Sequence, residues 1–159
     1  MMVSVRRSLK TILPGTLLFL ASMAVTLTFP QALSAQSLCV KAARANLRAG
    51  PGTEHRITWE VNRWMPLVQV GTEEEWIKVR DVDGDLHWIY APLVTSKISC
   101  VTISAPKANI RRKPTTKSDK WFTVEKYTSF KRTGGKNKWV RIEYEGETMW
   151  IFNKLVWPN

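Results

Sequence analysis

The sequence predicts an all-β protein made of two small tandem domains. The first observation is an internal repeat: residues 45–80 align without a gap with residues 108–143 at an offset of 63, and one deletion then brings Leu93 onto Leu155. The second is the alternation of apolar and polar residues in Trp76–Arg80 and again in Trp139–Glu143. The third is the lack of a helical apolar stripe in the repeats. A repeat of this period indicates the number and size of the domains.

Each repeat is expected to hold about five short strands, which favours a small barrel or a two-sheet sandwich. A glycine turn, Asp83-Gly84 or Glu145-Gly146, separates the last two strand candidates of each repeat, which is typical of a β-hairpin. Pro66 breaks the earlier candidates. In chain order the candidates are Ile57–Val61, Leu67–Val70, Trp76–Arg80 and Leu86–Tyr90 in the first repeat, and Trp139–Glu143 and Thr148–Phe152 in the second.

A family resemblance rests on three motif elements that occur in the same order in both repeats. In the first they are Asn46-Leu47-Arg48-x-Gly50-Pro51-Gly52, Trp76-x-Lys78-Val79-Arg80, and Gly84 followed by Trp88-Ile89 and Leu93. In the second they are Asn109-Ile110-Arg111, Trp139-x-Arg141-Ile142, and Gly146 followed by Trp150-Ile151 and Leu155. This pattern resembles the bacterial SH3 domain over roughly residues 39–157.

The resemblance implies two SH3-like β-barrels of five strands, each with its termini close together, and a binding role towards cell-wall peptides or neighbouring proteins. We expect the first domain at residues 36–98 and the second at residues 99–159. The second repeat departs from the pattern, because Lys113 and Thr115 replace Gly50 and Gly52. Glycine permits positive φ or a close backbone approach, so we expect a different loop in the second repeat.

Residues 1–35 have the layout of a cleavable signal peptide. A basic start that ends at Lys10 precedes a mostly apolar stretch, Leu17–Phe29, and the small-residue segment Leu33-Ser34-Ala35 offers a cleavage site. We therefore expect an exported protein, periplasmic or secreted, with no membrane span after cleavage. The alternative is an uncleaved membrane anchor, since Ile12–Phe29 approaches spanning length.

The two cysteines flank the first repeat. Cys39 lies just before it and Cys100 just after it, and cysteines of an exported chain are expected to be oxidised. If the ends of the barrel meet, a Cys39–Cys100 bond would close a loop of about 60 residues, which the chain-entropy model values at about 4 kcal/mol. That would matter for a unit too small to bury much surface. The alternative is two free, buried thiols.

The net charge of +11 is divided unevenly. Residues 36–98 hold 8 basic and 8 acidic residues, whereas residues 99–159 hold 13 basic and 5 acidic residues. The acidic segment Glu73–Glu75 aligns with Lys136-Asn137-Lys138. Three interpretations are open: solvated loop tips of drifted composition, an electrostatic site in the second repeat for an anionic partner, and head-to-tail self-association through the two oppositely charged loops.

Aromatic residues at matching positions are further binding candidates. Trp76 and Trp139 lie on the polar face of their strands, where an aromatic side chain can line a groove for an extended peptide. Trp64 aligns with Tyr127, which either forms the other wall or covers the barrel end. Trp88 and Trp150 are expected to belong mainly to the core. The ligand-binding candidates are Trp64, Trp76, Tyr127 and Trp139 for stacking, and Arg111, Arg112, Lys113, Lys136 and Lys138 for charge.

No motif of catalysis or metal binding stands out in the sequence. Cys39, Cys100 and the two histidines, His55 and His87, include no close ligand pair of the kind that binds zinc. The acidic turn Asp81–Asp85 is interpreted as a solvated hairpin tip, with weak calcium binding as the minor alternative. Hydrolases that carry such domains hold the nucleophile in a separate domain, for which this chain has no length. We therefore expect no enzyme, no cofactor and no metal.

These observations predict a non-catalytic binding or adaptor protein of the cell envelope, which recognises peptidoglycan or another anionic envelope component through its basic second domain. The alternative is a structural or assembly protein that binds an envelope protein or itself, so the oligomeric state stays open. A basic half with exposed aromatic residues is also used to bind single-stranded nucleic acid. Export makes that ligand unexpected here.

Overall fold

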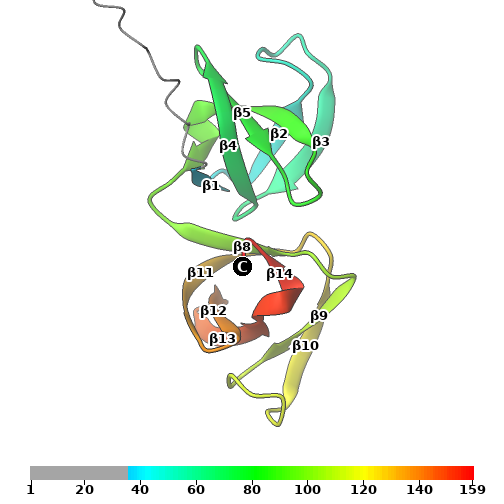
Figure 1. Ribbon diagram of the computed structural model, residues 1–159, viewed down its shortest axis with the longest axis vertical. Coiled ribbons are helices and arrows are strands. Elements are labelled where there is room, and N and C mark those ends of the chain that lie inside the picture. The colour runs from blue at the N-terminus through cyan, green and yellow to red at the C-terminus, as the bar shows by residue number, and fades with distance from the viewer. Residues whose placement is uncertain (1–35) are drawn as a thin grey trace, which may run out of the picture. The chain divides into compact units, whose positions relative to one another are not determined.

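The computed structural model describes residues 36–159, so the expected signal peptide and its cleavage site lie outside the described residues. The described chain consists of strands and two short 3-10 helices, η1 (Ala91–Leu93) and η2 (Asn153–Leu155), which confirms the all-β class. Two curved sheets form, one from each repeat (Figure 1). Within residues 36–159 there is no helix with the length and apolarity needed to cross a membrane.

The first sheet has the strand order β3-β2-β6-β5-β4-β1-β7, and we call its strands the first domain. Its first and last strands pair antiparallel, with Cys39 opposite Thr95, so the two ends of this domain meet as expected. The strands are β1 (Ser37–Val40), β2 (Arg44–Arg48), β3 (Ile57–Asn62), β4 (Pro66–Glu73), β5 (Trp76–Arg80), β6 (Leu86–Tyr90) and β7 (Val94–Thr95).

The second sheet repeats this topology in the order β10-β9-β13-β12-β11-β8-β14, and we call its strands the second domain. Each pairing of the first sheet has its counterpart here; for example, β8 pairs with β14 as β1 pairs with β7. The strands are β8 (Ser99–Ile103), β9 (Lys107–Arg111), β10 (Lys120–Glu125), β11 (Ser129–Lys136), β12 (Trp139–Tyr144), β13 (Glu147–Phe152) and β14 (Val156–Trp157).

The hairpins predicted from the glycine turns are confirmed, because β5 pairs with β6 and β12 pairs with β13. Gly84 and Gly146 take φ of 95° and 78°, a left-handed region that suits glycine. Pro66 does not lie outside the strand but opens β4, a position where its missing N–H is tolerated. Each domain has seven short strands rather than five. The strands that were not among the candidates are β1, β2 and β7 in the first domain and β8, β9, β10, β11 and β14 in the second.

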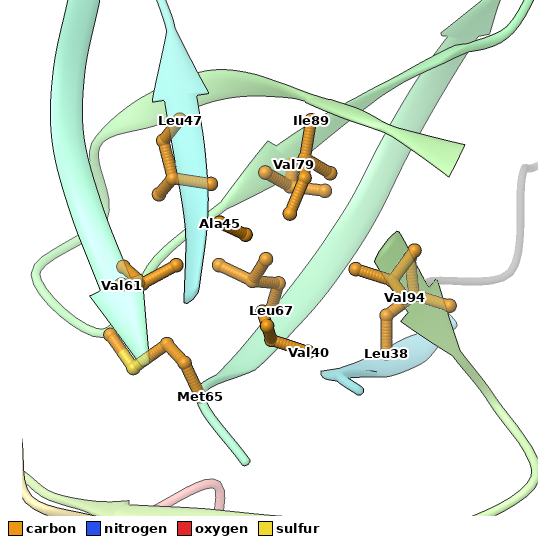
Figure 2. Packing of buried hydrophobic residues seen from close by; sticks show 10 residues of the cluster. All are labelled: Leu38, Val40, Ala45, Leu47, Val61, Met65, Leu67, Val79, Ile89 and Val94. Atoms are coloured by element: carbon orange, nitrogen blue, oxygen red, sulfur yellow. The ribbon is translucent and has the colours of Figure 1, made fainter. Parts of the chain in front are cut away.

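Each domain has its own hydrophobic core. In the first, Leu47, Leu67, Val79 and Ile89 point inward from different strands and are fully buried (Figure 2). The second core uses mostly the equivalent positions. Its fully or almost fully buried members are Val101, Ile103, Ala108, Ile110, Val140, Ile142, Met149, Ile151 and Val156.

The expectation that Trp88 and Trp150 belong mainly to the core is wrong. Both are only half buried, because side chains alternate along a strand and the neighbouring Ile89 and Ile151 take the inward positions. Trp88 lies instead on the outer face, where the Lys78 ammonium is 5.8 Å from the ring centroid.

The predicted disulfide is confirmed between Cys39 and Cys100, which are 61 residues apart. Cys100 belongs to β8, the first long strand of the second sheet, so the bond joins β1 of one domain to β8 of the other. It therefore does more than close the first domain. The second domain, which has no disulfide of its own, is covalently tied to the first at a buried point.

Candidate binding grooves

The first domain carries a groove of about 600 Å³ beside strands β2 and β5, which we call the first groove. Trp76 from the start of β5 and Tyr90 from the end of β6 form its aromatic wall, with ring centroids 5.7 Å apart. They meet because Trp76 pairs directly with Tyr90 across the hairpin, on the outer face. The other lining residues are Arg44, Ala45, Asn46, Arg48, Gly52, Thr53, Glu54, Glu60, Glu75 and Leu93.

The loop after β2 forms one rim of this groove, and its glycines are required. Arg48 at the end of β2 donates hydrogen bonds from Nη1 to the carbonyl oxygens of Thr53 and His55, at 2.9 and 2.7 Å. The His55 ring then packs so closely over Gly50 that a Cβ there would lie 2.6 Å from ring atoms. Gly52 has φ of 150°, a conformation that residues with side chains rarely adopt. The sequence motif therefore encodes the shape of this rim.

The second domain carries a smaller groove, of about 210 Å³, which we call the second groove. Trp139 and Phe152 form its aromatic wall, with centroids 5.5 Å apart, and they too are paired across a hairpin. The guanidinium of Arg111 donates to the carbonyl oxygen of Ser118 and so holds the neighbouring loop. The other lining residues are Asn109, Thr116 and Leu155.

The two grooves occupy equivalent places in the two domains. Every lining residue of the second groove aligns with a lining residue of the first. The pairs are Asn46 with Asn109, Arg48 with Arg111, Thr53 with Thr116, Trp76 with Trp139, Tyr90 with Phe152, and Leu93 with Leu155. Both domains therefore have a groove with an aromatic pair at the same strand positions. These grooves are the best-supported candidate binding sites in the described chain.

Some of the predicted site residues lie in these grooves. Trp76 belongs to the first groove, and Trp139 and Arg111 belong to the second. Lys138 directly precedes Trp139 and is exposed beside the second groove. Tyr90 and Phe152 were not among the predicted site residues. Their alternation with Ile89 and Ile151 and their shared aromatic character were signals that could have indicated them.

Other predicted residues lie elsewhere. Arg112 does not face the second groove, because its guanidinium stacks 3.6 Å from the ring centroid of Trp121, which is 51% exposed. Lys113 and Lys136 are exposed, the first in the loop after β9 and the second at the end of β11. They contribute to the charge of the second domain without lining its groove.

Trp64 and Tyr127 do not lie beside Trp76 or Trp139, the tryptophans of the two grooves. Both take left-handed backbone conformations, with φ of 71° and 70°, which is uncommon for bulky residues. Trp64 donates its backbone N–H to Val40, and Arg63 lies 5.8 Å from its ring centroid. The expected stacking of Tyr127 beside Trp139 is not observed, since Tyr127 packs edge-on against Trp59 of the first domain at 5.1 Å.

Tyr127 and its neighbour Lys126 also bind the acidic turn of the first domain. The Lys126 ammonium and the Tyr127 hydroxyl each donate to the Asp83 carboxylate, at 2.7 Å. The hydrogen bond from Lys126, followed by that from Tyr127, holds the pKa of Asp83 below its ordinary value of 3.8. The same bond to Asp83 raises the pKa of Lys126 above its ordinary value. Asp83 is therefore a contact between the domains rather than a free hairpin tip.

A polar network lies behind this turn. The Asp81 carboxylate, 4% exposed, accepts the backbone N–H groups of Asp83 and Asp85 and the Nε2–H of His87 at 3.1 Å. With Nε2 donating, Nδ1 of His87 accepts a hydrogen bond from the Thr58 hydroxyl at 2.8 Å. This chain of hydroxyl, imidazole and carboxylate has the arrangement in which a histidine serves as a general base. The sequence analysis did not connect these residues, which are up to 29 positions apart. No group of three or more possible metal ligands occurs among residues 36–159.

Comparison with known families finds the same domain twice. A model described as a bacterial SH3 domain matches residues 41–95, and a second model with the same description matches residues 106–156. Both matches contain the groove tryptophan of their repeat. Together they cover most of the part of the chain that the structure describes.

A curated protein of Bacillus subtilis (strain 168), YrvJ, is similar over most of the chain. It is provisionally named an N-acetylmuramoyl-L-alanine amidase and is 24% identical over 143 residues. The aligned region is 81% of this chain but only 27% of the relative, so the chain spans about a quarter of that protein.

Two solved structures were also found to be similar. NlpC1 from Trichomonas vaginalis is 16% identical with a TM-score of 0.37, covering 92% of this chain and 52% of its own. An NlpC/P60 family protein from Bacillus cereus ATCC 10987 is 11% identical with a TM-score of 0.37, covering 76% and 55%. At these TM-scores the likeness carries no argument about function.

The similarity to YrvJ contradicts the expectation that the protein is not an enzyme. That expectation rested on the lack of a recognisable nucleophile or zinc motif in the sequence. Yet 81% of the chain aligns with a segment of a protein named as an amidase. The missing motif was therefore no ground for the expectation that the protein is not an enzyme.

Proposed function

The chain belongs to the bacterial SH3 domain family in both of its repeats, and from this premise we propose that it binds peptidoglycan and keeps a wall-degrading activity at its substrate. The binding would take place in the two grooves, with Trp76 and Trp139 as stacking surfaces. The activity is suggested by the similarity to YrvJ, whose name describes an amidase of the wall. The proposed location is the envelope or the exterior of the cell, reached by cleavage of residues 1–35.

The observation that carries the proposal is the repetition of the groove. Each groove runs along the outer face of a hairpin and has a paired aromatic wall, Trp76 with Tyr90 or Trp139 with Phe152. Aromatic-lined grooves of SH3-type domains suit extended peptides, and peptidoglycan carries short peptides along its glycan strands. The first groove, at about 600 Å³, is in the usual range of ligand sites. Two such sites in one chain would raise the apparent affinity for a repetitive polymer.

The basic second domain would add a weaker, less specific attraction to an anionic wall. Arg112, Lys113 and Lys136 lie outside the second groove, so their contribution would be long-range. Such exposed charges act over about 8 Å at physiological ionic strength. We therefore assign specificity to the grooves and part of the association rate to the charge.

If the chain itself hydrolyses the wall, the Thr58–His87–Asp81 network is where its described residues could move a proton. His87 is held by Asp81 and faces the Thr58 hydroxyl. A shallow cavity of about 220 Å³ adjoins it, lined also by Trp59 and Tyr127.

Cosedimentation with purified sacculi tests the binding half. Oxidised residues 36–159 are expected to sediment with the sacculi, and Trp76→Ala and Trp139→Ala should each weaken binding about tenfold, the equivalent of 1.4 kcal/mol. Trp121→Ala is the matched control, because Trp121 is exposed and lines neither groove. Undiminished sedimentation of the double Trp76/Trp139 variant would refute binding through the grooves.

Release of dye from labelled sacculi tests the enzymatic half with the full chain. We expect release by the wild-type chain, slower release by the double tryptophan variant, and loss of release by His87→Gln, which cannot take up a proton. Release by His87→Gln at the wild-type rate would show that His87 takes no part in the hydrolysis. Sedimentation with sacculi without any release of dye would support wall binding and refute the wall-degrading activity.

A further inference from the structure

The two grooves occupy equivalent places but have opposite charge at their rims. The first groove is lined by three carboxylates and two guanidiniums. At the positions equivalent to the carboxylates, the second domain has two lysines and a threonine, while both basic positions stay basic. The aligned pairs are Glu54 with Lys117, Glu60 with Thr123, Glu75 with Lys138, Arg44 with Lys107 and Arg48 with Arg111.

Most charges of the first groove are already engaged. Arg48 is held by the two loop carbonyl oxygens, and Arg44 lies 3.5 Å from Glu60 in an exposed ion pair. Glu54 lies 3.3 Å from the His55 ring. Among residues 36–159, Glu75 has no ion pair and no side-chain hydrogen bond, so its carboxylate is an available charge next to the aromatic wall.

The backbone places Glu75 and Lys138 in the same position. The carbonyl oxygen of Glu75 accepts the N–H of Ala91 at 2.9 Å, and that of Lys138 accepts the N–H of Asn153 at 2.9 Å. Each residue directly precedes the groove tryptophan of its domain. The difference between the two sites is thus a change of side-chain charge on a shared scaffold.

We propose that the first groove selects a peptide segment bearing a primary ammonium group, with Glu75 as its counter-ion and the Trp76–Tyr90 wall as its stacking surface. The second groove, with Lys138 in the same place, excludes that group. This inference rests on the proposed binding function of the grooves and names the chemistry of the occupant.

Charge and aromatic surface act together in this site. An ammonium group is attracted both by a carboxylate and by the face of an aromatic ring. The partly enclosed groove strengthens the pairing relative to an open surface. Neither guanidinium of the first groove opposes it strongly, since Arg48 and Arg44 are engaged as described.

The test is an NMR-detected titration of the oxidised protein at low salt with two matched peptides, acetyl-Ala-Lys-Ala-amide and acetyl-Ala-Glu-Ala-amide. The lysine peptide should bind more tightly than the glutamate peptide and should shift the indole N–H of Trp76 but not that of Trp139. Glu75→Lys should weaken the lysine peptide about tenfold, with a smaller loss at high salt. Lys138→Glu should add binding of the lysine peptide at Trp139.

Glu73→Lys is the matched control, since it changes the net charge of the same hairpin by the same amount but does not line the groove. It should leave the affinity within about twofold, as expected for a screened charge outside the site. Equal losses for Glu73→Lys and Glu75→Lys would overturn the proposal, because only the overall field would then matter. Equal affinity for the two peptides, or no binding of the lysine peptide by the wild-type protein, would overturn it as well.

The sacculus experiment separates this inference from the proposed function. Sedimentation that depends on Trp76 but not on Glu75 would leave wall binding intact and remove the ammonium site. Binding of the lysine peptide that depends on Glu75, without sedimentation of the protein, would keep the ammonium site and remove the wall as its source.

Discussion

The two domains share one fold but solve the same packing problem differently. Three positions that form the polar network in the first domain, Thr58, Asp81 and His87, are Trp121, Tyr144 and Met149 in the second. His87 and Met149 are both buried at the same point of the sheet. The fold therefore accepts either a hydrogen-bonded network or an apolar filling there.

In the second domain, the apolar contacts at these positions stabilise only that domain. Tyr144 packs against Phe122 and Phe130, with ring centroids 4.9 and 6.1 Å apart, and Met149 belongs to the core. The equivalent turn of that domain, at Glu145, has no ion pair or side-chain hydrogen bond among residues 36–159. Buried apolar contacts are not directional, so they give the turn no side-chain hydrogen bond beyond its backbone pairing.

In the first domain, the polar network also positions a residue that contacts the second domain. Asp81 accepts two backbone N–H groups and thereby orders the turn that carries Asp83. Asp83 then binds Lys126 and Tyr127 of the other domain. The comparison teaches that a polar residue costs the core little when fully satisfied, and that its hydrogen bonds can position a neighbouring binding residue.

The largest expected effect comes from removing the disulfide cross-link between the domains. The double variant Cys39→Ser, Cys100→Ser should lose about 4 kcal/mol of the free energy of unfolding, since the oxidised bond restricts a long loop in the unfolded chain. Urea unfolding of the oxidised protein and the variant measures this loss. The reduced wild-type protein is the control and should behave like the variant. A loss below about 1 kcal/mol would show that the bond is not a main source of stability.

The polar network should be the next most sensitive feature. Asp81→Ala leaves His87 and two turn N–H groups without their acceptor, and we expect a loss of about 3 kcal/mol in urea unfolding. Asp85→Ala, in the same turn but exposed, should change stability by less than about 0.5 kcal/mol. Similar losses for both variants would mean that the turn, rather than the buried carboxylate, is what matters.

The smallest effect is expected from the exposed contact between Asp83 and Lys126. Because the folded pKa of Asp83 is lowered, its contribution is present above the unfolded pKa near 4 and is lost as the pH falls through the lower folded pKa. The contribution should be small, since the pair is solvent-exposed and screened. The pH dependence of thermal unfolding, wild type against Asp83→Asn, measures it.

Glu145→Gln is the matched control, because Glu145 occupies the equivalent turn of the second domain without a partner among residues 36–159. Its acid profile should follow the wild type. If Asp83→Asn matched the wild type above pH 4 as well, where the contact contributes fully, the contact would contribute nothing to stability.

The sequence was sufficient for the all-β class, the two-domain organisation, the hairpins and the disulfide. These features depend on local chemistry and on spacing: alternation in Trp76–Arg80, a glycine turn at Gly84, and two cysteines at the matching ends of a repeat. The groove tryptophans were also recognisable, because they lie on the outer face of an alternating strand.

The tertiary structure decided how these pieces combine. Only the structure shows that Tyr90 packs against Trp76 and that Cys39 is bonded to a strand of the other domain. It also shows that Tyr127 contacts Asp83 rather than forming the expected groove wall. The physical reason is that periodicity and turn residues act over a few positions, whereas a groove or a hydrogen-bonded network joins strands whose register is set only when the whole sheet closes on its core.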